Sequence, residues 1–157
     1  MNYTTEHLLL IPLGPEHAGA YAQLYRTLYT DTIFLPGETD IDFTQRIKDA
    51  CTCIYALYDR QGTEQLIGDC ALHHFDEAAG TIEIGGALLP EYQGKGLMRQ
   101  AFECLIGIAQ NQYHAPHIIA RTASDNIAAI KLALHLGFQI QTADEAETVL
   151  MKHIGTL

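Results

Sequence analysis

The stretch TIEIGGALLPEYQGKGLMRQAF, residues 81–102, decides the fold of this chain. Its first eight residues have the apolar, β-branched character of a strand, and apolar side chains recur from Leu97 at the spacing of an amphipathic helix. Between the two lies Gln93-Gly94-Lys95-Gly96. Glycine lets the backbone approach a ligand closely, and the following helix directs unpaired N–H groups and its positive dipole end at the loop. The junction therefore predicts a site for phosphate or pyrophosphate.

Residue spacing separates three kinds of phosphate-binding loop. The P-loop needs Ser or Thr after its lysine, but Lys95 is followed by Gly96. The dinucleotide fingerprint needs a glycine where this chain has Arg99. The acyl-coenzyme-A loop, Q/R-x-x-G-x-G/A, is matched by Gln93 and Gly96, with Met98 at its last position. The spacing thus favours a coenzyme A site over a nucleotide site.

Hydrophobic periodicity and turn residues divide the rest of the chain into alternating elements. Helices are expected at residues 15–28, 40–50, 97–113 and 126–136. Strands are expected at residues 6–12, 52–58, 65–75, 81–88, 116–122, 138–142 and 147–154. This order predicts an α+β, or mixed α/β, fold in one domain that spans residues 1–157.

Composition narrows the class of partner. The net charge of −10 argues against nucleic-acid binding, which needs a basic face, and it is compatible with a cationic amine substrate. No apolar run approaches the roughly 20 residues that span a bilayer, and the first residues do not have the pattern of a signal peptide. The four cysteines fall within expected helices and strands or, for Cys51, directly beside one, as buried reduced thiols do. We therefore expect a cytoplasmic protein that binds neither membrane nor nucleic acid.

Three blocks of sequence resemble the GNAT N-acetyltransferase superfamily. They are TTEHLLLIPLGPEHA, EIGGALLPEYQGKGLMRQAF and SDNIAAIKLALHLGF, at residues 4–18, 83–102 and 124–138. The first also resembles the branch that acetylates the N-terminal alanine of ribosomal proteins. The resemblance implies acetyl-CoA as cosubstrate and a monomer or homodimer acting on an amine. It also implies a twisted, mostly antiparallel sheet of six or seven strands with about four helices, splayed centrally for acyl-CoA.

The resemblance also implies the residues that bind the cofactor. Backbone amides of the loop and the first helical turn would hold the pyrophosphate; these residues are Gln93, Gly94, Lys95, Gly96, Leu97 and Met98. Leu88 and Leu89 stand where the family's strand bulges, so that backbone amides there can hold the thioester and the pantetheine arm. Asn126 would cap the following helix, a role that Asn favours, and would also contact the coenzyme A arm.

Glu83 is the candidate catalytic base. Ile82 and Ile84 share one face of the expected strand, so Glu83 points to the other, where the family often uses a glutamate to relay the amine proton. Deprotonation at neutral pH costs about 1 kcal/mol for an α-amine and about 4 kcal/mol for a lysine amine, so one carboxylate suffices for an α-amine. The alternative is a solvated carboxylate on an exposed sheet face. Ala133 and Ala129 stand where relatives carry a tyrosine acid and a serine.

A metal site is not expected. His73-His74, His114-x-x-His117 and Cys51-x-Cys53 lack a recognised ligand spacing, and adjacent residues of a strand point to opposite faces. The histidines at 73 and 74 are assigned instead to the acceptor cleft.

Three functions stay open on the sequence. The first is acetyl-CoA-dependent N-acetyl transfer to a protein α-amine, by direct attack on the thioester. The second is a non-catalytic module that binds or senses acyl-CoA. The third keeps the chemistry and changes the acceptor to a small amine, such as a polyamine or an antibiotic.

Overall fold

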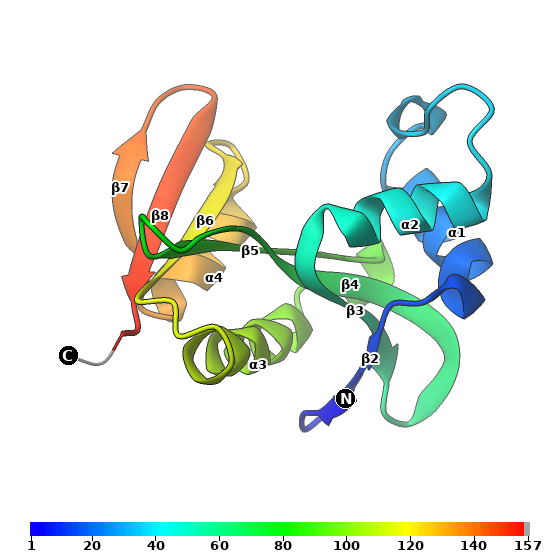
Figure 1. Cartoon of the computed structure of the whole chain (residues 1–157), viewed down its shortest axis with the longest axis horizontal. Helices are drawn as coiled ribbons and strands as arrows, with labels where there is room; N and C mark the ends of the chain where they lie inside the picture. Colours follow the sequence, from blue (N-terminus) through cyan, green and yellow to red (C-terminus); the bar gives the residue numbers. More distant parts are fainter. Residues whose placement is uncertain (156–157) are drawn as a thin grey trace.

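A computed structural model describes residues 1–155, which form a mixed sheet with helices on both faces (Figure 1). The strands are β1 (Tyr3–Thr4), β2 (Leu8–Pro12), β3 (Cys51–Asp59), β4 (Gly62–Asp76), β5 (Thr81–Leu88), β6 (His117–Ala123), β7 (Gln139–Ala143) and β8 (Glu147–His153). The helices are α1 (Ala18–Leu28), α2 (Asp40–Asp49), α3 (Leu97–Asn111) and α4 (Ile127–His135). Short 3-10 turns occur at Pro15–His17, Asp31–Ile33 and Pro90–Tyr92. The mixed class and the four expected helices are confirmed.

The strands of the described chain lie in the order β1-β2-β3-β4-β5-β6-β8-β7, and every pairing is antiparallel except that of β5 with β6. The sheet has 8 strands, one more than the upper number expected. The extra strand is β1, in which Tyr3 and Thr4 pair with Leu10 and Leu9. A two-residue strand has too little alternation to be recognised in a sequence.

The sheet opens between β5 and β6. Their parallel pairing covers Thr81–Glu83 against His117–Ile119, whereas β5 stays paired with β4 as far as Leu88. Figure 1 shows β5 crossing between the two halves of the molecule. Beyond Glu83, one edge of β5 therefore has no strand neighbour, and this is the central splay that the resemblance implied.

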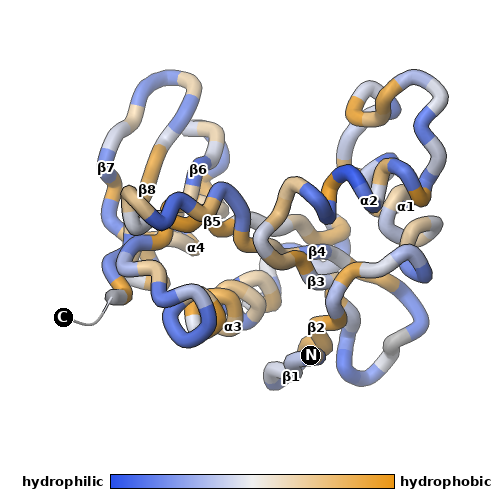
Figure 2. The backbone as a smooth tube through the Cα atoms, viewed as in Figure 1, coloured by the Kyte–Doolittle hydropathy of each residue, from blue (hydrophilic) through white to orange (hydrophobic). Residues whose placement is uncertain are grey.

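Each face of the sheet buries a different cluster of side chains. Apolar residues of α3 and α4 pack on one face, against Ile82, Ile84 and Ile118. Residues of α1 and α2, including Tyr21 and Phe43, pack on the opposite face of β3 and β4. The orange segments of Figure 2 follow these contacts along the middle of the sheet and along α3. No helix within residues 1–155 is long and apolar enough to cross a membrane.

Candidate functional site

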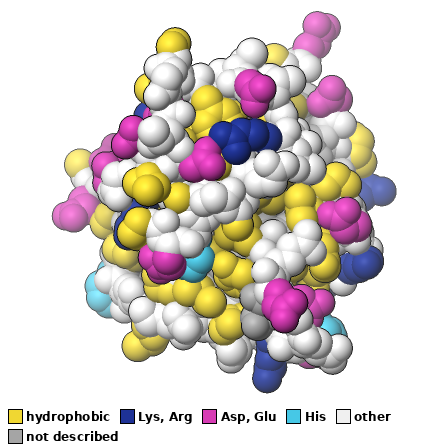
Figure 3. Space-filling model, turned by 90° about the vertical axis from the view of Figure 1, so that its right-hand side faces the viewer, with side chains coloured by type: hydrophobic (Ala, Val, Ile, Leu, Met, Phe, Trp, Pro, Cys, Tyr) yellow, Lys and Arg dark blue, Asp and Glu magenta, His cyan; other side chains and the backbone are white. Residues whose placement is uncertain are grey.

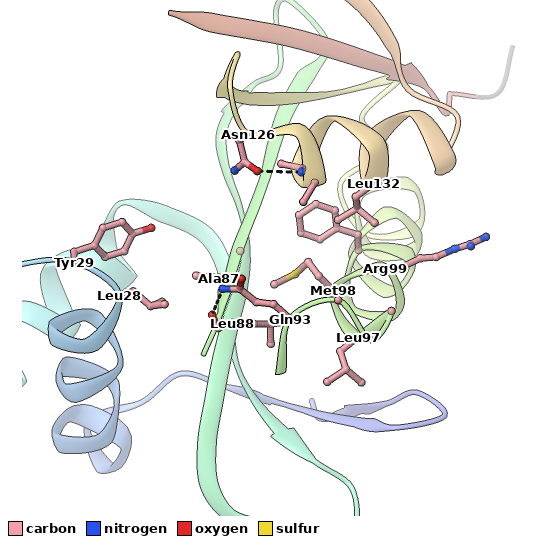
Figure 4. A pocket seen from close by; sticks show the side chains of 16 residues that line it. Leu28, Tyr29, Ala87, Leu88, Gln93, Leu97, Met98, Arg99, Asn126 and Leu132 are labelled. Atoms are coloured by element: carbon pink, nitrogen blue, oxygen red, sulfur yellow. Dashed lines mark hydrogen bonds between the residues drawn. The ribbon is translucent and has the colours of Figure 1, made fainter. Parts of the chain in front are cut away.

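A cavity of about 460 Å³ passes through the opening in the sheet. In Figure 4, Leu28 at the end of α1 and Tyr29 just after it lie on one side of β5, whereas Met98 and Asn126 lie on the other. The remaining lining residues come from β5, the glycine loop, α3 and α4: Gly86, Ala87, Leu88, Gln93, Gly94, Gly96, Leu97, Arg99, Phe102, Ala128, Ala129 and Leu132. A ligand on the α3–α4 side can therefore meet a second ligand that enters from the α1 side.

The glycine loop ends at the amino end of α3. Gly94 and Gly96 have φ angles of 75° and 79°, in the left-handed region that other residues rarely adopt. Gly96 is the N-cap residue of α3, and no side chain caps that helix. The N–H groups of the first turn thus face the cavity without a side-chain acceptor, as an anion site requires.

The backbone of Leu88 is directed into the opening. The Ala87 N–H donates to Asp69 Oδ1 at 3.1 Å, and the Leu89 N–H donates to the Ile67 carbonyl at 2.8 Å, so both point towards β4. Because successive N–H groups of a strand point in opposite directions, the Leu88 N–H points away from β4. The Gln93 side chain donates to the Leu88 carbonyl at 3.0 Å and fixes this edge.

The expected cofactor residues divide into two groups. Seven of them line the cavity: Leu88, Gln93, Gly94, Gly96, Leu97, Met98 and Asn126. Leu89 does not line it, because its side chain is buried with those of α1 and α2. Lys95 does not line it either, because its Nζ lies 5.7 Å above the ring of Tyr92, as a cation–π contact. For all of them, contact with coenzyme A stays a prediction.

Glu83 lies outside this cavity, on the face of the sheet that α1 and α2 share. Its Oε1 accepts a hydrogen bond from Arg121 Nε at 3.1 Å, and Arg121 Nη1 lies 3.6 Å from Glu147. The Glu83 side chain is 15% exposed, so it is a paired and largely covered carboxylate rather than a freely solvated one. It lies four residues before Ala87, or about 13 Å along the strand, so water must connect it to a reaction at the opening.

The expectation that His73 and His74 point to opposite faces is wrong. Their Nδ1 atoms are 2.6 Å apart. His74 has a φ of 49°, and the register of β4 against β5 is irregular between His73 and Asp76, so the alternation of side chains breaks there. Burial lowers the pKa of His73, and the charge of Glu83 opposes that shift.

A buried carboxylate connects α1 to the opening, and sequence reasoning missed it. Asp69 Oδ2 accepts hydrogen bonds from the hydroxyls of Tyr21 at 2.7 Å and Tyr25 at 2.6 Å, while Oδ1 accepts from Ala87. Burial raises the pKa of Asp69, although its hydrogen bonds oppose the shift. The ring of Tyr29 stacks on that of Tyr25, with centroids 5.5 Å apart. The one visible signal was an aspartate between the apolar residues of LIGDCAL, residues 66–72.

Comparison with known proteins now identifies the class. The family model described as an acetyltransferase (GNAT) domain matches residues 7–139. The chain therefore belongs to the GNAT family of acetyltransferase enzymes. It is also 32% identical over 77 residues to an uncharacterized N-acetyltransferase p20 of Bacillus licheniformis. That match covers 49% of this chain and 43% of the relative, so the chain spans less than half the length of this curated relative.

Solved structures share the fold over almost the whole chain. The ribosomal-protein-S5-alanine acetyltransferase of Vibrio fischeri has a TM-score of 0.77 at 18% identity, covering 98% of this chain and 96% of that one. The ribosomal L7/L12 α-N-protein acetyltransferase RimL, in complex with coenzyme A, has a TM-score of 0.80 at 14% identity, covering 97% of each chain. At these identities the likeness establishes the architecture, and the substrate has to be argued from the site.

Proposed function

We propose that this protein transfers an acetyl group from acetyl-CoA to a primary amine, by direct attack of the amine on the thioester. The observation that carries the proposal is the cavity through the sheet. It joins an anion site at the amino end of α3 to a free backbone donor, the Leu88 N–H, and then to the α1 face. A cofactor that carries both a pyrophosphate and a thioester fits this order of groups.

The residues divide the chemistry between them. Amides of the glycine loop and the first turn of α3 bind the pyrophosphate, and the free edge of β5 binds the pantetheine arm. The Leu88 N–H stabilises the thioester oxygen as it gains negative charge, when the amine nitrogen bonds to carbon. Glu83 takes the amine proton through water, and the C–S bond breaks as the coenzyme leaves as a thiolate. Thiolate is a fair leaving group, so the reaction can proceed although Ala133 stands where relatives carry a tyrosine that protonates the thiolate.

We propose a protein α-amine as the acceptor. The two solved neighbours described above are named for ribosomal-protein substrates. Glu83 is already engaged by Arg121, which suits the small demand of an α-amine rather than that of a lysine. Figure 3 shows hydrophobic side chains on the side that carries α1 and α2, with acidic and basic side chains around them. The net charge of −10 favours the approach of a cationic amine. The four cysteines are free thiols, which suits the reducing cytoplasm.

A second candidate is a non-catalytic module that binds acyl-CoA. One observation favours it: Tyr29 is the only residue lining the described cavity that carries a hydroxyl. Release of free thiol from acetyl-CoA separates the two functions. The acceptors compared are peptides with a free α-amine, α-blocked peptides with one lysine, a polyamine and an aminoglycoside. We expect turnover with the α-amine peptides; tight coenzyme A binding without turnover on any acceptor contradicts the enzyme.

Glu83→Gln tests the proton relay. We expect kcat/KM to fall by about tenfold or more, because the glutamine cannot accept the amine proton. Glu147→Gln is the matched control, because it removes the other carboxylate beside Arg121 and leaves Glu83 in place. An unchanged rate in Glu83→Gln across pH 6–9 shows that another group, or water alone, takes the proton.

A further inference from the structure

Three side chains with metal-binding atoms converge outside the cavity. His73 and His74 of β4 and Glu83 of β5 each offer one ligand atom, and these atoms all lie within 4.8 Å of one another. No other group of three His, Cys, Asp or Glu side chains comes this close among the described residues. Two imidazole nitrogens and one carboxylate oxygen form a donor set typical of Zn²⁺ sites that keep open positions.

The backbone is shaped to bring these groups together. In an unbroken strand the two imidazoles would lie on opposite faces. The left-handed conformation of His74, at a φ of 49°, turns its ring to the side of His73. A histidine seldom adopts this conformation, and strained residues of this kind cluster at functional sites. His73 is the register partner of Glu83, so those two side chains lie beside one another.

The absence of a side chain at Gly85 leaves room for the His73 ring. A Cβ placed on Gly85 would lie 3.5 Å from His73 Nε2, so the ring lies above this glycine with that nitrogen towards the sheet. The other nitrogen, Nδ1, is then left to meet His74 Nδ1 at 2.6 Å. Zinc–nitrogen bonds of about 2.05 Å at a tetrahedral angle place two ligand nitrogens about 3.3 Å apart. The two Nδ1 atoms must therefore move slightly apart from their separation of 2.6 Å, and a small rotation of the exposed His74 ring achieves this.

We propose that His73, His74 and Glu83 form a binding site for a divalent transition-metal cation of the zinc type, with Nδ1 of both imidazoles and one carboxylate oxygen as ligands. Water occupies the remaining positions. The Nδ1 proton shared between the two imidazoles passes through solvent to Nε2 of its own ring when the ion binds, so both rings act as neutral ligands through Nδ1.

Arg121 limits the affinity of this site. Its guanidinium donates to Glu83 and repels a cation. However, the Arg121 side chain is half exposed, and Glu147 offers it a second carboxylate. Arg121 can therefore stay paired with Glu147 while the Glu83 carboxylate turns to the ion. We expect a reversible site rather than a structural one. Where Glu83 serves as the proton acceptor of the proposed acetyl transfer, an occupied site also inhibits the enzyme.

The test is direct binding of Zn²⁺ to the whole chain, by competition with a chromophoric chelator and without acetyl-CoA. We expect one ion per chain, and Co²⁺ in its place should give visible absorption bands. His73→Gln and His74→Asn each raise the Kd roughly tenfold or more. Asparagine is chosen at 74 because it tolerates the left-handed conformation. Arg121→Gln lowers the Kd several-fold, because a repelling charge is gone.

His153→Gln is the matched control. His153 and His117 also pair through Nδ1 atoms, at 3.3 Å, but they lack a third ligand at the required spacing. This variant keeps the affinity of the unchanged chain. Zinc binding that survives both substitutions in β4, or that is lost in the control, overturns the site. Because binding is measured without acetyl-CoA, its failure leaves the proposed acetyl transfer intact, and a failure of acetyl transfer leaves the binding result intact.

Discussion

The two sides of β5 offer different groups to the ligands proposed above. On the α3–α4 side, the groups of the proposed donor site are main-chain amides, supplied by the glycine loop and by Leu88. On the α1–α2 face, outside the cavity, they are side chains: Glu83, Arg121 and the paired histidines. The first set depends on backbone conformation and the second on residue identity.

This difference explains why the donor is easier to assign than the acceptor. Every residue carries the same amide, so a backbone site needs only the glycines that allow its conformation. Spacing of glycines is visible in a sequence. A side-chain site is assembled from distant strands, and its chemistry changes with each substitution.

Removing the Asp69 carboxylate is expected to have the largest effect, because it joins the two ends of the cavity. Asp69→Ala leaves the hydroxyls of Tyr21 and Tyr25 and the Ala87 N–H without their acceptor. We expect the free energy of unfolding to fall by about 3 kcal/mol, measured by urea denaturation. The KM values for acetyl-CoA and for the acceptor should both rise. A change in only one of them would show that the two ends are mechanically independent.

Two further variants complete this test: one is a control that removes an exposed carboxylate, and the other removes the charge of Asp69. Asp125→Ala removes an exposed carboxylate and should change stability by at most about 0.5 kcal/mol. Burial raises the pKa of Asp69 in the folded state, so its contribution to stability is full below about pH 4 and is lost as pH rises through the folded pKa. Asp69→Asn lacks this titration. Relative to Asp69→Asn, the original chain should therefore lose stability as pH rises from 4, and a relative gain in stability would contradict the raised pKa.

Local patterns in the sequence predicted most of the fold. Helix α3, expected at residues 97–113, occupies Leu97–Asn111, and α4, expected at 126–136, occupies Ile127–His135. These elements follow from apolar periodicity and from capping residues, which are properties of neighbours in the chain. The glycine loop was predicted for the same reason, because its conformation depends on its own residues.

The features that the sequence did not predict depend on distant or unusual geometry. The tyrosines that bind Asp69 lie 48 and 44 residues before it, so the network appears only after folding. The meeting of the histidines depends on one residue, His74, adopting a left-handed conformation that no local pattern marks. The lining role of Tyr29 depends on where α1 ends against β5. Each lies on the α1–α2 side, where the proposed acceptor site is built from side chains.

Gly96→Val tests the donor side alone and should have an intermediate effect. A β-branched residue is strained at a φ of 79°, and its side chain obstructs the approach of a ligand to the backbone. We expect the KM for acetyl-CoA to rise about tenfold with the KM for the acceptor unchanged. Gly107→Ala is the matched control, since this α3 glycine has open space around it and alanine should stabilise the helix by about 0.5–1 kcal/mol. An equal rise in both KM values would mean that the loop does not serve the donor alone.

Asn126 offers the finest test, because it combines a side-chain role with a place on the donor side. Its Oδ1 accepts the Ala129 N–H at 3.1 Å and so caps α4, while the residue also lines the cavity. Asn126→Ala should lower the free energy of unfolding by about 1 kcal/mol, whereas Asn126→Ser keeps a capping oxygen and should lose only a few tenths. If the amide also contacts coenzyme A, both variants raise the Kd for coenzyme A by about threefold, since both lose that hydrogen bond. Titration with coenzyme A, beside thermal unfolding of the same samples, separates the roles. Normal affinity in the serine variant would reduce Asn126 to a helix cap and leave the donor side built from backbone alone.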